Sequence, residues 1–468
     1  MIIPRKNLAD NCLFINEELA KAGLFGSPKR ELHPDQKVPW QISPRPFRLD
    51  QRTANQLSEL GHHLLLFLRA CQQLYQESLR GRQPQWAAAY LHQGKPDAII
   101  EYGQMRRFRS DLPLIIRPDI ILADQGLVAS ELDSVPGGFG LLAALSQVYA
   151  DLGFQLIGGP RGILQGFSKA LAPHLSSKKP VLAIVVSEES RDYWEEMVWL
   201  GRTLDESGLR THILRPEEIY FREEGLFTRT GEQLDILYRF FELFDLKNIP
   251  KIDLILYAIR KKKVMATPPL KSYLEEKLLF ALFHHPLLAP FWLNNLGKES
   301  HDLLQDLFPR TWILDPRPLP PHGIIPNLRL GEQMVGNWQQ LKAATQKQRQ
   351  FVIKPSGFSE LAWGGRGVSI GHDLSQDQWG EVLDLALASF EHTPYVLQEF
   401  VKGARVAMDY YDFATGTIKT MDGRVRLCPY YFVQGEEAPL GGVLATVCPA
   451  NKKIIHGMVD GIMVPASS

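Results

Sequence analysis

Cysteine, net charge and long apolar runs are all scarce in this sequence of 468 residues. Its four cysteines show no CxxC spacing, which argues against a disulfide framework or a zinc site and favours a reducing cytoplasm. Lys+Arg and Asp+Glu both total 52, so no net charge attracts the chain to nucleic acid or to an anionic membrane. No stretch approaches the roughly 20 apolar residues of a membrane span. We therefore expect neither nucleic acid nor membrane among the partners.

Two common catalytic motifs are also missing. The chain has no GxxxxGK[ST] phosphate loop and no GxSxG nucleophile elbow, so these two routes to phosphate binding and to serine catalysis are excluded. A GxGxxA pattern runs from Gly138 to Ala143 between an expected strand and an expected helix. The next apolar segment, FQLI, is not followed by the acidic residue that a dinucleotide ribose requires. The pattern therefore favours a dinucleotide-dependent redox enzyme only weakly.

The composition is that of a globular protein, with 45% hydrophobic and 22% charged residues. The length predicts roughly two to four domains, and the texture of the sequence changes along four regions. Residues 1–108 are mainly helical, because leucines recur at helical spacing over residues 50–92. Residues 109–178 contain two apolar strands and a helix, and residues 179–265 alternate strands with helices. Residues 266–468 open with a helical segment over 267–283 and are then dominated by strands. We expect an α/β (α+β) fold.

The region 179–265 has the order of a Rossmann-like unit. VLAIVV (181–186) is a strand of the fully buried type, an amphipathic helix follows over 191–208, and RTHIL (210–214) is a second strand. Strand–helix–strand order implies a parallel pair covered by helices. We expect this unit to bind substrate.

The stretch FVIKPSGFSELAWGGRGVSIG (351–371) joins two apolar strands through a loop much longer than a hairpin requires. Gly364, Gly365 and Gly367 free a loop whose backbone N–H groups can approach phosphate oxygens closely. Lys354, at the end of the first strand, supplies a fixed positive charge for the same phosphates. A solvated lysine followed by a flexible hairpin is an equally good interpretation of this stretch alone.

The stretch RPDIILADQGLVASELDSV gathers charged residues on two apolar strands. Arg117 and Asp119 share one face of the first strand, and Glu131 and Asp133 share one face of the second, because alternate residues point the same way. Three carboxylates at one place repel unless a cation neutralises them, which predicts Mg²⁺ shared with substrate phosphates. The alternative is an exposed hairpin that carries a charge pair.

A third polar pair, Gln398 and Glu399, lies at the end of the strand YVLQEFV before a glycine turn. In a nucleotide cleft, backbone groups at such a strand edge can bind an adenine, and a nearby carboxylate can bind the ribose hydroxyls. An edge strand with solvent-facing polar residues explains the pair equally well.

Together these three patterns resemble the ATP-grasp superfamily, and their order resembles its circularly permuted branch, typified by glutathionylspermidine synthase. The family's R-x-D followed by E-x-N matches Arg117, Asp119 and Glu131, with Asp133 in place of the asparagine. This departure keeps an oxygen ligand and adds a negative charge. The resemblance covers residues 110–465.

The phosphate-binding residues of the family also have counterparts. Its KP…GRxG loop resembles the segment that contains Lys354, Gly365, Arg366 and Gly367. Its second lysine resembles Lys277 in the segment EEKLLFALF. In this sequence the carboxylate strands precede the lysine loop, which is the permuted order.

The resemblance implies a circularly permuted ATP-grasp fold with a Rossmann-like pre-ATP-grasp domain and an N-terminal helical region. It implies a ligase that uses ATP and Mg²⁺ to join a carboxylate, from an amino acid or small peptide, to an amine through an acyl phosphate. An ATP-grasp phosphotransferase and a non-catalytic nucleotide-binding protein remain alternatives, and a homodimer remains open. The loop 356–367 is then expected to close over the site and exclude water. The implied roles are catalysis for Arg117, Lys354 and Arg366, nucleotide binding for Lys277, Lys354, Gly364, Gly365, Gly367, Gln398 and Glu399, and metal binding for Asp119, Glu131 and Asp133.

Overall fold

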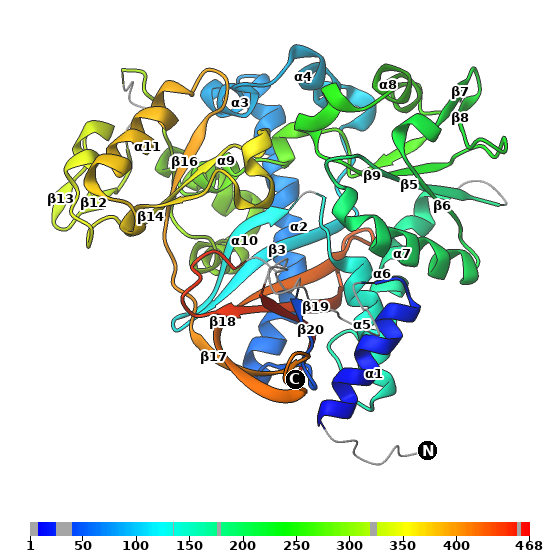
Figure 1. Cartoon of the computed structure of the whole chain (residues 1–468). Helices are drawn as coiled ribbons and strands as arrows, with labels where there is room; N and C mark the ends of the chain where they lie inside the picture. The colour runs from blue at the N-terminus through cyan, green and yellow to red at the C-terminus, as the bar shows by residue number, and fades with distance from the viewer. Residues whose placement is uncertain (1–7, 25–39, 134, 176–178, 319–324, 456–459) are drawn as a thin grey trace.

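Three β-sheets and the helices packed on them account for most of the computed structural model (Figure 1), which describes residues 8–24, 40–133, 135–175, 179–318, 325–455 and 460–468. The described helices are α1 (Leu8–Lys21), α2 (Gln51–Leu79), α3 (Gln85–His92), α4 (Asp97–Gln104), α5 (Phe139–Asp151), α6 (Gly162–Leu171), α7 (Trp194–Glu206), α8 (Ile252–Arg260), α9 (Leu278–Phe283), α10 (Ala289–Leu307) and α11 (Gln376–Ala388). None of these helices is both long enough and apolar enough to cross a membrane.

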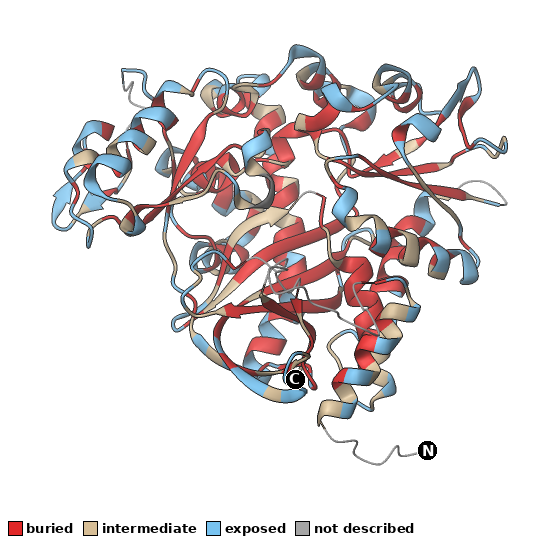
Figure 2. Cartoon of the chain, viewed as in Figure 1, coloured by how far each residue is buried: buried red, intermediate tan, exposed pale blue. Residues whose placement is uncertain are grey.

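Among the described residues, the largest sheet has eight strands and is built around one long strand, β18 (Thr417–Phe432). The path through it runs β1-β20-β19-β18-β3-β4, with β17 on β18 and β2 on β20. Its apolar face is buried under helices α5 and α6, and Figure 2 shows the resulting buried layer. The other strands of this sheet are β1 (Trp40–Gln41), β2 (Phe47–Arg48), β3 (Ile115–Ala123), β4 (Gly126–Asp133), β17 (Arg405–Asp412), β19 (Leu440–Pro449) and β20 (Gly461–Ser467).

The second sheet is the expected Rossmann-like unit. Its strands are β5 (Val181–Val186), β6 (Arg210–Leu214), β9 (Ile236–Phe240) and β10 (Met265–Thr267), all parallel in the order β10-β9-β5-β6. Every residue of β5 is buried, as expected for a parallel strand covered on both faces. The prediction of a parallel strand–helix–strand unit is confirmed. A small hairpin of β7 (Tyr220–Arg222) and β8 (Gly225–Phe227) lies beside α8.

The third sheet is antiparallel and carries the lysine loop. Its order is β11-β16-β14-β15, from β11 (Thr311–Ile313), β14 (Phe351–Pro355), β15 (Ser369–Ile370) and β16 (Tyr395–Glu399). Helix α11 packs on β14. Ser375, the residue before it, caps the helix: its side chain accepts a hydrogen bond from the backbone N–H of Gln378. The predicted strand after the loop is shortened to two residues. Between β11 and β14 in the sequence, β12 (Arg329–Leu330) and β13 (Gln333–Met334) form a separate antiparallel pair.

The N-terminal region is less separate from the rest than its helical texture indicates. Helix α2 is capped by Asp50, whose carboxylate accepts a hydrogen bond from the backbone N–H of Thr53 at 2.8 Å. The helix packs against α3 and α10. Strands β1 and β2 pair with β20 at the other end of the chain. The helical periodicity of α2 was visible in the sequence, but the pairing of two-residue strands was not.

The helical segment predicted over residues 267–283 is found only in part, as the 3₁₀ turn Ser272–Leu274 and helix α9. Only α9 is α-helical there, because Pro268 and Pro269 lack N–H donors and their carbonyls accept the guanidinium of Arg239 at 3.2 and 3.5 Å. The strand-dominated texture predicted for the C-terminal region agrees with β16 to β20.

Candidate active site

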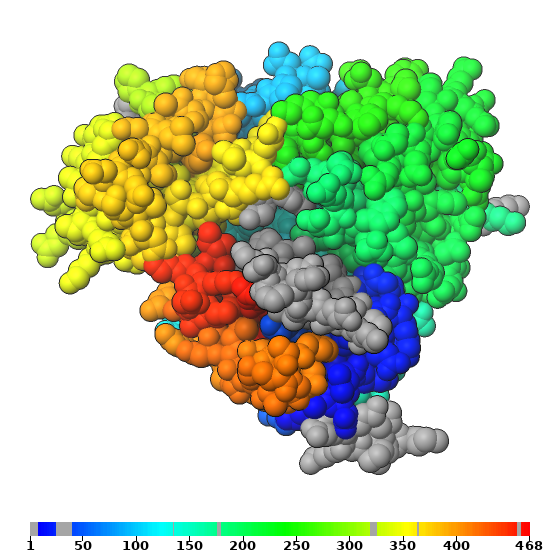
Figure 3. Space-filling view, in the orientation of Figure 1, coloured from blue at the N-terminus to red at the C-terminus, as the bar shows by residue number. Residues whose placement is uncertain are grey.

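The three sheets meet around one cavity of about 290 Å³, and Figure 3 shows the face of the molecule on which these parts of the chain come together. Strands β3, β4 and β18 of the large sheet form one wall. The ends of β14 and β16 and the loop after β14 form a second wall, and residues of the Rossmann-like unit form the third. Such a junction of units is a common place for a ligand site.

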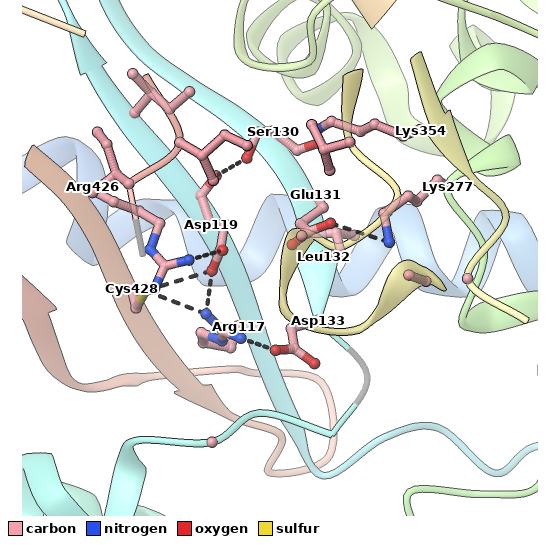
Figure 4. A pocket seen from close by; sticks show the side chains of 18 of the residues that line it. Arg117, Asp119, Ser130, Glu131, Leu132, Asp133, Lys277, Lys354, Arg426 and Cys428 are labelled. Carbon is pink, nitrogen blue, oxygen red and sulfur yellow. Dashed lines mark hydrogen bonds and ion pairs between the residues drawn. The ribbon is translucent and has the colours of Figure 1, made fainter. Parts of the chain in front are cut away.

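Strands β3 and β4 bring the four predicted charged residues to one place. Arg117 pairs in register with Asp133, and Asp119 pairs with Glu131, with a register shift directly after Asp119. All four residues line the cavity, as Figure 4 shows. The prediction that these side chains converge is confirmed.

The charges on this hairpin are neutralised by side chains of the protein. The Arg117 guanidinium forms ion pairs with both Asp119 and Asp133. Arg426, on β18, donates to the second oxygen of Asp119 at 2.7 Å. The Cys428 thiol lies 3.5 Å from the same carboxylate. Repulsion between the carboxylates was the reason to predict a metal, and two arginines supply much of the compensating charge.

Asp119 does not fit a metal ligand in this arrangement. Its side chain is only 4% exposed, and both of its oxygens have arginine partners. In the described part of the chain, no three His, Cys, Asp or Glu side chains are grouped so that they could bind a metal ion. Glu131 and Asp133 remain, with side chains 32% and 22% exposed. Mg²⁺ usually takes only one or two carboxylates when phosphate oxygens complete its shell, so these two residues fit an ion that arrives with a nucleotide.

Two lysines face Glu131 from other parts of the chain. Lys277 lies 3.2 Å from the Glu131 carboxylate, directly before α9. Burial opposes ionisation of Glu131, but Lys277 and Lys354 outweigh it and lower the pKa of this carboxyl to about 2. The pKa of Lys277 is raised, because Glu131 outweighs the effect of its own burial. The cavity floor therefore carries a fixed negative charge between two lysines.

Lys354 is buried and oriented by hydrogen bonds. Its ammonium donates to the side-chain oxygen of Gln398 at 2.8 Å and to the carbonyl of Ser130 at 3.2 Å. Burial lowers its pKa to about 8, against the opposing attraction of Glu131. The lysine is thus placed by its neighbours and is not a solvated side chain, which contradicts the alternative interpretation of this stretch.

Gln398 and Glu399 do not present the backbone edge that we expected. The Gln398 amide is committed to Lys354 and, at 3.2 Å, to the hydroxyl of Thr311. The Glu399 N–H donates to the carbonyl of Arg310 at 2.9 Å. The Glu399 side chain still lines the cavity, and burial raises the pKa of its carboxyl. Gln398 therefore positions Lys354, and both residues line the cavity together with Glu399.

The glycine loop forms a 3₁₀ turn, Glu360–Gly365, that includes Gly364. Gly365 lines the cavity with a φ of 73°, a conformation that favours glycine. Gly367 has a different role from the predicted one, because its N–H donates to the Leu361 carbonyl at 2.9 Å. A Cβ on Gly367 would lie 2.8 Å from the Pro355 ring. Close packing of the loop therefore requires this glycine.

Arg366 points out of the site. Its side chain is 58% exposed and lies 3.0 Å from Glu189 of the Rossmann-like unit. A second exposed ion pair joins Glu360 of the loop to Lys247 of the same unit at 2.5 Å. Because the reacting groups would lie in the cavity, the predicted catalytic role of Arg366 is not supported, and its contact connects the loop to the Rossmann-like unit.

Several residues of the site were missed from the sequence, among them Arg426, Cys428 and Glu276. Arg426 and Cys428 alternate on a strand that was predicted, but nothing in the sequence indicated that this strand pairs with β3. Glu276, directly before Lys277, accepts hydrogen bonds from Lys95 and from Ser356 at the base of the loop. These contacts join residues 80 or more positions apart, so only the fold reveals them.

This arrangement of sheets matches that of a solved synthetase-like structure over the full length of the chain. In particular, the chain is similar to the apo structure of a glutathione synthetase-like effector from Globodera pallida. The two share 11% sequence identity with a TM-score of 0.58, and the match covers 100% of this chain and 99% of that one. The expected resemblance is thereby confirmed at the level of the fold.

A candidate gamma-glutamylcysteine synthetase from Methylobacillus flagellatus KT also matches, with 12% identity and a TM-score of 0.43 over 78% of this chain and 84% of its own. The sequence matches no protein-family model and no curated protein. The chemistry of the site must therefore be argued from its own residues.

Proposed function

We propose that the chain is an ATP-dependent carboxylate–amine ligase, which activates the carboxylate of an amino acid or small peptide as an acyl phosphate and transfers the acyl group to an amine. The observation that carries the proposal is the placement of two lysines, the partly buried Lys277 and the buried Lys354, around Glu131 on the floor of the cavity. Cations gathered in a partly closed site favour the charge that spreads over a transferring phosphoryl group. The synthetase-type fold supports the same conclusion.

The residues divide into two groups by what they would do. Lys354 and Lys277 would bind phosphate oxygens, with Gln398 fixing the position of Lys354. Arg117 is the cation of β3 nearest the exposed carboxylates, and it would orient the acyl group beside them. The loop after β14 would exclude water, which otherwise hydrolyses an acyl phosphate.

Magnesium is part of the proposal, with Glu131 and Asp133 as its protein ligands. Bound there, the ion would neutralise charge on the phosphate oxygens. Asp119 is left out of this set, because it is buried and both of its oxygens have arginine partners, whereas Asp133 is more exposed and pairs with Arg117 through one oxygen. Its role would be to keep both arginines in place.

The test is nucleotide turnover by wild-type protein supplied with a mixture of the common L-amino acids and small peptides. We expect ADP and phosphate only when both carboxylate and amine are present. Lys354→Met should abolish this turnover, whereas Lys347→Met, at an exposed lysine of the same unit, should retain it. Wild-type rates in Lys354→Met, or phosphate retained on an acceptor, would contradict the ligase assignment.

One observation favours a second candidate, a non-catalytic nucleotide-binding protein. The described residues form no cluster of three metal-ligating side chains, and the Arg117 pairs close part of the carboxylate site. Calorimetric titration with ATP, with and without Mg²⁺, distinguishes the two. Binding without any ADP release under every substrate mixture would favour this second candidate.

A further inference from the structure

The wall of the cavity that comes from the Rossmann-like unit has a different charge from the wall that faces it. Within residues 179–265, the described lining residues are Asp192, Tyr193, Glu196, Glu242 and Phe244. Every charged member of this set is acidic. The facing strands carry both carboxylates and the arginines that pair with them, and Lys277 and Lys354 add further cations there, so a positively charged group is favoured on the wall of the Rossmann-like unit.

Two of the three carboxylates on this acidic wall are not free to act on a substrate inside the cavity. Glu196 accepts the backbone N–H groups of Gly138 and Leu141 at 2.7 and 3.0 Å, so it caps the start of α5. Asp192 is exposed to solvent. Neither is placed to act as a base within the cavity.

Glu242 differs from both. It follows β9 by two residues, at the carboxyl end of a parallel strand, where ligands of open α/β sheets usually bind. It is partly buried and lines the cavity. No hydrogen bond or ion pair joins its side chain to another described residue. The aromatic side chains of Tyr193 and Phe244 line the same wall, and aromatic faces attract organic ammonium groups.

We propose that Glu242 binds the ammonium group of the amine substrate and removes its proton before the amine attacks the acyl phosphate. This inference rests on the proposed ligase function and deepens it by placing the amine on the Rossmann-like wall. The substrate class is a primary amine that is protonated when it binds.

The proton transfer balances as follows. An ammonium nitrogen has no free electron pair, so one proton passes from nitrogen to a carboxylate oxygen of Glu242. The nitrogen pair then forms a bond to the acyl carbon, and the bond from that carbon to the phosphate oxygen breaks with its electrons on phosphate. The nitrogen loses its second proton to the departing phosphate, and Glu242 later releases the first proton to water.

The surroundings of Glu242 suit such a base. Burial raises the pKa of its carboxyl to about 7, and this effect outweighs the lowering by Arg239, Lys277 and Arg117. Glu131, across the cavity, raises it further. A base works best when its pKa lies near the working pH. Because Glu242 must be ionised to accept a proton, amide formation is expected to rise as the pH increases through about 7.

The experiment compares two acceptors with the same enzyme. Wild-type protein and Glu242→Gln receive ATP, Mg²⁺ and the amino-acid mixture, with or without hydroxylamine, and both amide and hydroxamate products are measured. Hydroxylamine is largely unprotonated at neutral pH, so it needs no base to attack an acyl phosphate. We expect Glu242→Gln to lower amide formation by roughly 10²–10⁴-fold and to lose its rise with pH, while hydroxamate formation stays within about threefold. Glu223→Gln, at an exposed carboxylate of the same unit, is the matched control.

The outcomes separate the two proposals. If wild-type protein forms neither product, the ligase function and the role of Glu242 both fail. If it forms both products and Glu242→Gln lowers them by the same factor, or lowers neither, the ligase function stands and the role of Glu242 is overturned. A pH profile of amide formation unchanged in Glu242→Gln would also overturn it.

Discussion

A buried ion pair connects the N-terminal helices to the base of the glycine loop, and its removal tests whether the loop is fixed from there. The Lys95 ammonium lies 2.5 Å from the Glu276 carboxylate, and both side chains are 0% exposed. The Ser356 hydroxyl donates to the same carboxylate at 2.6 Å, and the Gly357 N–H lies 3.4 Å from its other oxygen. A Cβ on Gly357 would lie 1.8 Å from the Glu275 carbonyl. The loop therefore starts from a tightly packed, charged junction.

The expected cost follows from the burial of both charges. Removing one partner of a fully buried pair leaves the other charge without compensation and costs about 3–5 kcal/mol. We expect Lys95→Met to lower the free energy of unfolding by that amount, because the Glu276 charge would then lose its direct ion-pair partner and keep only hydrogen bonds from Ser356 and Gly357 and the attraction of Lys277. The double variant Lys95→Met/Glu276→Gln removes both charges. Its loss of unfolding free energy should therefore be smaller than the sum of the losses in the two single variants, by about 2 kcal/mol or more.

Urea unfolding followed by tryptophan fluorescence measures these differences. The matched control is Lys298→Met, because Lys298 pairs with Asp302 on an exposed helix face, with side chains 83% and 54% exposed. It should change the unfolding free energy by at most about 0.5 kcal/mol. If Lys95→Met behaves like this control, or if the double variant loses as much as the two single variants combined, the reasoning about the buried pair is refuted.

Three further predictions concern the site. Gln398→Leu should leave the Lys354 ammonium without its side-chain acceptor and weaken ATP turnover by about 1–3 kcal/mol of activation free energy, measured as kcat/KM; an unchanged value would show that Gln398 does not position the lysine. Glu242→Gln should raise the thermal midpoint above that of wild type at pH 8 but not at pH 4. A carboxyl whose pKa is raised to about 7 in the folded protein destabilises the fold as the pH rises from the ordinary pKa of a glutamate to about 7. If the variant and wild type have the same midpoint at pH 8, this reasoning is contradicted. Arg366→Gln should change stability by at most about 1 kcal/mol, since its pair with Glu189 is exposed, and a larger shift in calorimetry would give this contact more weight than its exposure supports.

Features of this chain were predictable from the sequence wherever the pattern of residues within one short segment determines the structure. Strand β5 and its neighbour β6 follow from a run of buried-type residues and a βαβ order, and the parallel pairing follows from that order. The convergence of Arg117, Asp119, Glu131 and Asp133 follows from two adjacent strands with alternate polar residues. In both cases the information lies within about thirty consecutive residues.

Contacts between distant segments were not predictable in this way. Arg426 neutralises Asp119 from a position 307 residues further along the chain, and one sequence carries no signal for that pairing. The metal prediction included Asp119 for the same reason: it counted the carboxylates of one hairpin without Arg426, the cation that β18 places beside Asp119. Gln398 was assigned to the nucleotide because its partner, Lys354, lies 44 residues away on the neighbouring strand.

The division of charge around the cavity explains why the site needs separate units. If one sheet carried both the lysines and the acidic wall, their side chains would pair with each other, as Lys277 already does with Glu131 across the floor. Glu242 avoids this because β9 approaches from the Rossmann-like sheet, and its side chain has no ion-pair partner among the described residues. The two units are joined by the buried ion pair of Arg239 with Glu275 as well as by exposed contacts such as Arg366–Glu189. The Glu242 carboxylate therefore remains available for the proposed amine substrate.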